Sequence, residues 1–183
     1  ETTVYDVLLE SASIAEAKVR SEKAGYDILG ANRELAGAEV ELVELERREA
    51  RLKAALTAAA PDYDFILIDC PPSLGLLTVN GLAAADDVIV PLQCEYYALE
   101  GLGMLLSNVS LVRRDLNPSL DVRGIVLTMF DARTKLAEQV EREVRGHFGA
   151  KVYRTVVPRT VRISEAPSFG QPRSEEHTSE LQS

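Results

Sequence analysis

The chain has 183 residues, 46% of them hydrophobic, and a formal net charge of −9 at pH 7. The length and hydrophobic content suit one domain with its own core. The negative net charge argues against a protein that coats nucleic acid through bulk charge, but it is compatible with a local basic patch. The two cysteines, Cys70 and Cys94, lack metal-ligand spacing, so we expect neither a disulfide scaffold nor a zinc site, and a reducing cytosol fits better. No apolar run reaches the roughly 18 residues that a membrane-spanning helix needs, so no membrane partner is expected.

The sequence pattern in the first third of the chain predicts two short helices, one strand and one long helix. In chain order these are helices over Thr3–Glu10 and Ser13–Arg20, a strand over Tyr26–Gly30 and a helix over about Glu34–Leu56. Ser13 and Glu16 have the spacing of a capping box, in which each side chain accepts a hydrogen bond from a backbone N–H at the helix start.

The rest of the chain alternates between apolar strands and helices. The expected strands are Phe65–Ile68, Asp87–Leu92, Val122–Phe130 and Val152–Val157. The expected helices between them are Leu76–Ala85, Ala98–Arg114 and Leu136–Phe148. The Phe65–Ile68 run is typical of a strand buried on both faces. This alternation predicts an α/β fold with a parallel sheet covered by helices on both faces, in which ligands bind at the C-terminal ends of the strands.

Asp69 lies at the first such strand end and is followed by the rigid turn Cys70–Ser73. A carboxylate at this place can hold the water shell of a phosphate-bound Mg²⁺. It can equally cap the helix that follows. The strand-plus-aspartate pattern alone leaves both interpretations open.

Four long segments resemble the ParA/Soj partitioning ATPases, a branch of the deviant Walker-A P-loop family, in the family's order and spacing. They read DFILIDCPPSLGLLTVN, VIVPLQCEYYALEGL, TMFDARTKLAEQVEREVRGHFG and VVPRTVRISEAPSFGQP. With weaker matches nearer the start, the resemblance covers about Val4 to Pro172. It implies a three-layer P-loop NTPase-like α/β fold with a mostly parallel sheet, truncated at its N-terminus.

The resemblance also implies a site for ATP and Mg²⁺. By it, Asp69 is the catalytic metal-supporting residue and holds Mg²⁺ through water, and Pro71 and Pro72 begin the switch that responds to the γ-phosphate. The family's adenine pocket is matched by two segments at strand ends: Met129 with Phe130, and Pro158 with Arg159 and Thr160. For Pro158, the sequence pattern alone favours a simple loop start.

The family further implies nonspecific DNA binding by an ATP-bound homodimer, with hydrolysis stimulated by a ParB-type centromere-binding protein. The matching DNA-contacting residues are Arg133 and Arg162. A few basic side chains aimed at phosphates are enough for such binding, even on an acidic protein. The expected location is cytoplasmic and nucleoid-associated.

The phosphate-binding pattern G-x-x-x-x-G-K-[ST] occurs nowhere in the chain. We therefore expect residues 1–172 to be a partial ParA-type domain that lacks its Walker A and switch I region and its last helix, and that does not hydrolyse ATP on its own. Residues 173–183 read RSEEHTSELQS, have no periodicity and are expected to be a non-native tail.

Three alternatives remain open at this stage. The first is a MinD-like ATPase that positions the division site, and the second is a non-hydrolytic DNA-binding or adaptor relative that keeps the fold. The third, an iron–sulfur reductase relative, needs cluster cysteines, whereas Cys70 and Cys94 lie in segments that match ParA better.

Overall fold

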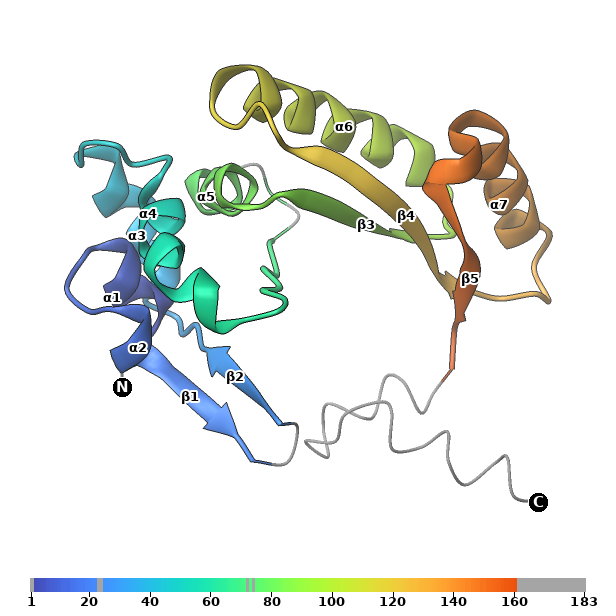
Figure 1. Ribbon diagram of the computed structural model, residues 1–183. Helices are drawn as coiled ribbons and strands as arrows, with labels where there is room; N and C mark the ends of the chain where they lie inside the picture. The colour runs from blue at the N-terminus through green and yellow to red at the C-terminus, as the bar shows by residue number, and fades with distance from the viewer. Residues whose placement is uncertain (1, 23–24, 72, 74, 161–183) are drawn as a thin grey trace. The chain divides into compact units, whose positions relative to one another are not determined.

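The computed structural model describes residues 2–22, 25–71, 73 and 75–160 (Figure 1). The chain divides into a first unit, Glu1–Val88 with Leu105–Asp121, and a second unit, Ile89–Met104 with the residues from Val122 on. The tail expected over residues 173–183 lies outside the described residues.

The first unit is mainly helical. Its elements are α1 (Val4–Leu8), α2 (Ile14–Ala17), β1 (Lys18–Ser21), β2 (Tyr26–Leu29), α3 (Leu35–Val43), α4 (Arg51–Ala59), the short 3₁₀ helix η1 (Ala60–Asp62) and α5 (Leu76–Ala84). The predicted capping box at the start of α2 is confirmed, because Ser13 N–H donates to Glu16 at 2.8 Å and Glu16 N–H donates to the Ser13 hydroxyl at 3.3 Å.

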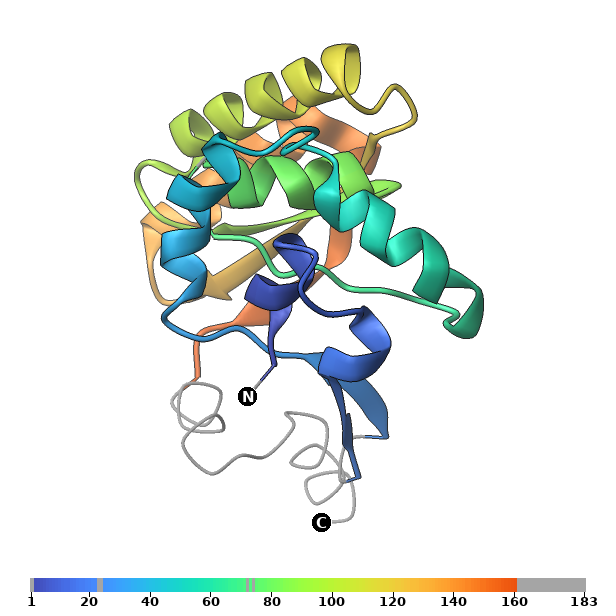
Figure 2. The ribbon, with the colours of Figure 1, turned by 90° about the vertical axis from the view of Figure 1, so that its left-hand side faces the viewer.

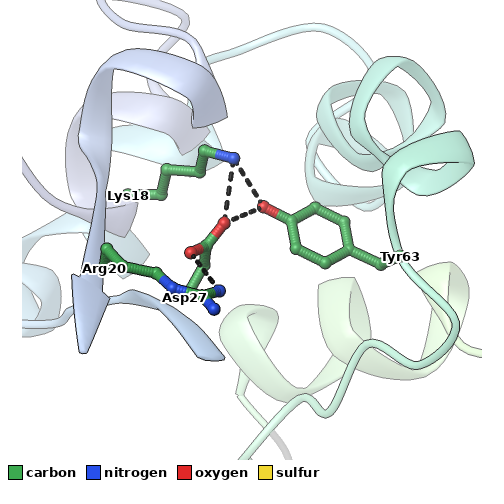
Figure 3. Close-up of polar contacts among 4 residues, drawn as sticks. All are labelled: Lys18, Arg20, Asp27 and Tyr63. Atoms are coloured by element: carbon green, nitrogen blue, oxygen red, sulfur yellow. Dashed lines mark hydrogen bonds and ion pairs between the residues drawn. The ribbon is translucent and has the colours of Figure 1, made fainter. Parts of the chain in front are cut away.

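The helix predicted over Ser13–Arg20 is wrong beyond Ala17. There the chain turns into β1, which pairs antiparallel with β2 (Figures 1 and 2). The Asp27 carboxylate on β2 accepts hydrogen bonds from Lys18 at 2.9 Å and Arg20 at 3.1 Å on β1, and from the Tyr63 hydroxyl at 2.7 Å (Figure 3). Tertiary pairing of this kind overrides a local helical preference.

The single helix predicted over Glu34–Leu56 is two helices, α3 and α4. Arg47, between them, has a left-handed backbone with a φ of 54°, and the Arg48 side chain donates to the Val43 carbonyl at the end of α3 at 2.9 Å. Leu42 of α3 and Leu52 of α4 pack in the same cluster, together with Leu8. The break lets both helices contribute to one core.

Two buried asparagines join elements of the first unit. The Asn80 amide on α5 accepts from Leu52 N–H at 3.1 Å and donates to the Arg48 carbonyl at 2.7 Å. Asn117 donates to the Leu82 and Ala85 carbonyls, at 3.1 and 2.7 Å, at the end of α5. Each satisfies backbone groups that would otherwise be buried without partners.

The strand predicted over Phe65–Ile68 is wrong. The described residues contain no strand there, and Phe65 and Leu67 are 85% and 89% exposed. A run of this kind becomes a buried strand only where neighbouring strands pair with its backbone and helices cover its faces. Among the described residues it has no pairing partner.

The second unit contains most of the predicted sheet. Its elements are β3 (Asp87–Gln93), the first part of α6 (Ala98–Asp115), β4 (Asp121–Phe130), α7 (Lys135–Phe148), η2 (Gly149–Lys151) and β5 (Val152–Pro158). The strands form a sheet in the order β3–β4–β5, and β4 and β5 are parallel (Figure 1). The predicted α/β class with a parallel sheet is confirmed. No helix in the described part of the chain is long and apolar enough to cross a membrane.

Candidate functional site

An open cavity of about 770 Å³ lies in the second unit, where β3, β4 and β5 end. Its lining residues come from the ends of these strands and the starts of α6 and α7: Leu92, Gln93, Cys94, Glu95, Tyr96, Tyr97, Ala98, Gly101, Leu102, Met129, Asp131, Thr134, Leu136, Ala137 and Arg159. The volume falls within the range of about 300 to 1,000 Å³ that small-molecule sites occupy. The position is the one that parallel sheets favour for ligands.

Met129 marks the end of β4 with an unusual backbone. Its φ of 52° is left-handed, and the pairing of β4 with β5 shifts register between Leu127 and Phe130. A non-glycine residue in this conformation is uncommon, and such residues gather at binding sites. The kink places Met129 among the residues that line the cavity.

The two segments predicted for the adenine pocket meet across β4 and β5. Phe130 is paired in register with Pro158, and Arg159 N–H donates to the Phe130 carbonyl at 2.9 Å. Met129 and Arg159 both line the cavity. The structure therefore brings four of the five predicted residues together at one edge of the sheet, and the fifth, Thr160, follows directly in the chain.

A tight turn joins this edge to α7. Thr134 caps α7 by accepting from Ala137 N–H at 3.3 Å, and its own N–H and hydroxyl both reach the Asp131 carbonyl at 3.0 Å. The turn fixes Asp131 in place at the cavity wall.

Asp131 and Arg133 form a bidentate ion pair within the same turn. Arg133 Nε and Nη2 donate to the two carboxylate oxygens at 2.9 and 2.7 Å, and Arg133 backbone N–H donates to Oδ1 at 3.0 Å. These side-chain hydrogen bonds, then the backbone one, hold the pKa of Asp131 well below its usual range, and the positive charge of Arg159 acts in the same direction.

Most of the remaining lining residues are aromatic or aliphatic, and Gln93 and Glu95 are polar. Tyr96 and Tyr97 meet edge to face with ring centroids 5.1 Å apart, and both are exposed. Cys94 is buried, and burial raises the pKa of its thiol, so it acts as a small apolar wall residue. These flat and aliphatic surfaces suit a planar ring.

Asp69 and Pro71 belong to the first unit. Asp69 is exposed at the end of the run that begins at Phe65 and has no regular secondary structure. The turn after it is tied to α5, because the buried Thr78 hydroxyl donates to the Ser73 carbonyl at 2.6 Å and lies 3.3 Å from the Pro71 carbonyl. Pro72 lies outside the described residues.

Of the two predicted DNA-contacting residues, Arg133 has an 88% exposed side chain, and Arg162 lies outside the described residues. Within the described part of the chain, no group of three or more His, Cys, Asp or Glu side chains could hold a metal ion.

Sequence reasoning missed Asp131, Thr134 and Thr78. A sequence signal existed for each. The pattern D-x-R-T just before a helix has the spacing of a turn and a cap, and Thr78 is one of two polar residues, with Asn80, in the mainly apolar segment of α5. The aromatic pair Tyr96–Tyr97 follows shortly after the end of β3 at Gln93, and a strand end is where a parallel sheet places ligands.

A family model described as an AAA domain matches residues 1–122. The chromosome partitioning protein ParA of Caulobacter vibrioides is 54% identical over 173 residues, which are 93% of this chain and 65% of that protein. The chromosome-partitioning ATPase Soj of Treponema pallidum is 51% identical over 172 residues, which are 94% of this chain and 68% of that protein. The chain thus spans about two thirds of the length of these relatives.

A solved structure with the same fold is a cobyrinic acid a,c-diamide synthase from Mycobacterium smegmatis with a bound ATP analogue and magnesium. Its TM-score is 0.81 at 38% sequence identity, and the match covers 93% of this chain and 74% of that one.

Proposed function

The chain belongs to the ParA/Soj family, and from this premise we propose that the protein is a Mg²⁺-dependent ATPase that partitions a chromosome or plasmid. The cavity at the ends of β4 and β5 takes the adenine base. ATP-dependent dimerisation, nonspecific DNA binding and stimulation by a ParB-type partner complete the proposed cycle.

The observation that carries this proposal is the junction between β4 and β5. The Arg159 N–H to Phe130 carbonyl bond at 2.9 Å and the Phe130–Pro158 pairing hold the two strand ends together beside the cavity. Met129 offers an apolar wall there, and Asp131 offers hydrogen-bond acceptors. An apolar slot with a few fixed polar groups fits a purine, which needs stacking surface and a hydrogen-bonding edge.

Asp69 is proposed to support Mg²⁺ through water. Mg²⁺ keeps several waters and takes few protein carboxylates when nucleotide phosphates supply the other ligands. An exposed carboxylate fits this role, and the Thr78 tether to the Ser73 carbonyl orients the turn that follows. When bound, the metal would neutralise charge on the phosphates.

DNA binding is proposed to rest on Arg133 and Arg162. The Arg133 guanidinium is exposed and matches phosphate geometry. The names of the relatives from Caulobacter and Treponema connect the family with chromosome partitioning.

The test is phosphate release by the protein expressed from its complete reading frame, with ATP, Mg²⁺ and DNA. We expect Mg²⁺-dependent release, and a loss of about 100-fold for Asp69→Asn, because the variant keeps the shape of the side chain but not its charge. Asp64→Asn, five residues earlier in the chain and also exposed, is the matched control and should stay near wild type. Release by the wild type that is insensitive to Asp69→Asn would contradict the role of Asp69.

The 183-residue chain itself has no G-x-x-x-x-G-K-[ST] pattern. We propose that this chain alone does not turn over ATP, because the backbone N–H cradle and lysine that this pattern supplies are missing from it. Clear phosphate release from the purified 183-residue chain would refute this.

A further inference from the structure

The Asp131 carboxylate occupies the edge of the Arg133 guanidinium with which a nucleic-acid phosphate would form hydrogen bonds. Arg133 uses Nε and Nη2, at 2.9 and 2.7 Å, to hold both oxygens of one carboxylate. Phosphate oxygens are recognised bidentately by the same fork of N–H donors. Carboxylate and phosphate therefore compete for one edge of one side chain.

The pair is built into the turn. The Asp131 carbonyl is held by the N–H and hydroxyl of Thr134, and the Asp131 carboxylate also accepts Arg133's own backbone N–H at 3.0 Å. The carboxylate is thus oriented by backbone contacts as well as by the guanidinium. Asp131 is 22% exposed and Arg133 88% exposed, so the guanidinium is open to solvent while its partner is partly enclosed.

We propose that Asp131 is an intramolecular competitor of nucleic-acid phosphate for Arg133, and so sets how strongly this protein binds DNA. The inference rests on the proposed DNA contact at Arg133. It assigns to Asp131 a positioning role in which the carboxylate holds the guanidinium in the DNA-free state and yields it to a phosphate.

The position of Asp131 connects this competition to the cavity. Asp131 lines the cavity, so a ligand there lies beside the residue that holds Arg133. A ligand that donates hydrogen bonds, such as the amino group of an adenine base, competes with Arg133 for the carboxylate oxygens of Asp131. Filling the cavity in this way weakens the pair and favours phosphate binding.

The experiment uses the complete protein with ATP and Mg²⁺ and a random-sequence DNA duplex, titrated at several salt concentrations. Asp131→Asn keeps the side-chain shape but removes the competing charge. We expect it to tighten DNA binding about two- to fivefold, the range that an exposed ion pair supports. Glu138→Gln is the matched control, because it removes one exposed negative charge from the first turn of α7 without touching the pair.

Arg133→Ala separates this inference from the proposed function. It should weaken binding and make the negative slope of log K against log salt shallower by about 0.9, the value for one lost phosphate contact. On the Arg133→Ala background, Asp131→Asn should then do no more than Glu138→Gln. If Arg133→Ala changes neither affinity nor slope, the DNA contact itself fails, and this inference falls with it.

The competition is overturned if Asp131→Asn, with Arg133 intact, tightens binding no more than Glu138→Gln or weakens it. The connection to the cavity has its own readout. The gain in DNA affinity on adding ATP should be smaller in Asp131→Asn than in Glu138→Gln, and equal gains would overturn it.

Discussion

The Asn80 side chain accepts the backbone N–H of Leu52 at 3.1 Å, across 28 residues of sequence. The same amide donates to the Arg48 carbonyl at 2.7 Å and to the Leu76 carbonyl at 3.0 Å. Asn80 is only 1% exposed. One amide thus satisfies backbone groups at the break between α3 and α4 and fastens them to α5.

Replacing Asn80 should therefore destabilise the first unit. Asn80→Ala removes three hydrogen bonds, among them the buried one from Leu52 N–H, so we expect the free energy of unfolding to fall by about 2 to 4 kcal/mol. Urea unfolding of the purified protein measures this. Thr57→Ala, which removes only an exposed hydroxyl bonded within its own helix, should change it by less than about 0.5 kcal/mol. Equal losses in the two variants would show that the Asn80 contacts are not stabilising.

The fall in the free energy of unfolding at acidic pH should depend on Asp27. The hydrogen bond from the Tyr63 hydroxyl, followed by those from Lys18 and Arg20, holds the pKa of Asp27 well below its usual range (Figure 3). A carboxyl whose pKa is lower in the folded than in the unfolded state stabilises the fold above the unfolded pKa of about 4. That contribution is lost as the pH falls below about 4 toward the folded pKa.

Urea unfolding between pH 2 and pH 7 tests this. Asp27→Asn should flatten the acid limb of the profile, and Tyr63→Phe should flatten it in part, because Tyr63 is the largest cause of the shift. Tyr26→Phe, which removes the hydroxyl of an exposed tyrosine on the same hairpin, is the control. Profiles for Asp27→Asn and wild type that stay parallel below pH 4 would rule the network out as a source of acid sensitivity.

Gly124 makes room for the Tyr153 ring between β4 and β5. A Cβ at Gly124 would lie 2.5 Å from Tyr153 Cε2 and 3.1 Å from the Lys151 carbonyl oxygen. Gly124→Ala should cost about 1 to 3 kcal/mol, the range for overpacking in a well-packed site. Gly146→Ala, in α7 with nothing within 4 Å, should be neutral or stabilising by up to about 1 kcal/mol.

Thermal unfolding of the two glycine variants provides the comparison. Adding Tyr153→Ala to Gly124→Ala should recover part of the loss, because it removes the ring that the new methyl group meets. If Gly124→Ala unfolds at the wild-type temperature, the strands accommodate the methyl group, and the close approach of Tyr153 to Gly124 does not limit stability.

The sequence predicted the second unit well because its signals are local. The apolar runs that became β3, β4 and β5, and the helices between them, were placed to within a residue or two. Met129 and Arg159 were placed at strand ends by the same pattern, which is why the cavity could be anticipated. The turn before α7 has a local signal in D-x-R-T, but the bidentate geometry of the Asp131–Arg133 pair depends on how that turn closes.

The first unit was predicted less well because its structure depends on distant partners. The break between α3 and α4 depends on Asn80, and the end of α2 depends on Asp27 and Tyr63, which are far from it in sequence. The run Phe65–Ile68 has the composition of a buried strand, but a strand also needs a neighbouring strand to pair with, and composition does not show whether one is present. The capping box at Ser13 was predictable because all its groups lie within three residues.

The most direct test of the nucleotide site uses the two methionines, Met104 and Met129. Met129 lines the cavity, whereas Met104 is 61% exposed on α6. With ¹³C-methyl methionine in the protein from the complete reading frame, and with assignment by Met→Leu variants, ADP is titrated by NMR. We predict a saturable shift of the Met129 methyl signal with little change at Met104. Saturable binding of ADP that leaves the Met129 signal unmoved would contradict an adenine site at the ends of β4 and β5.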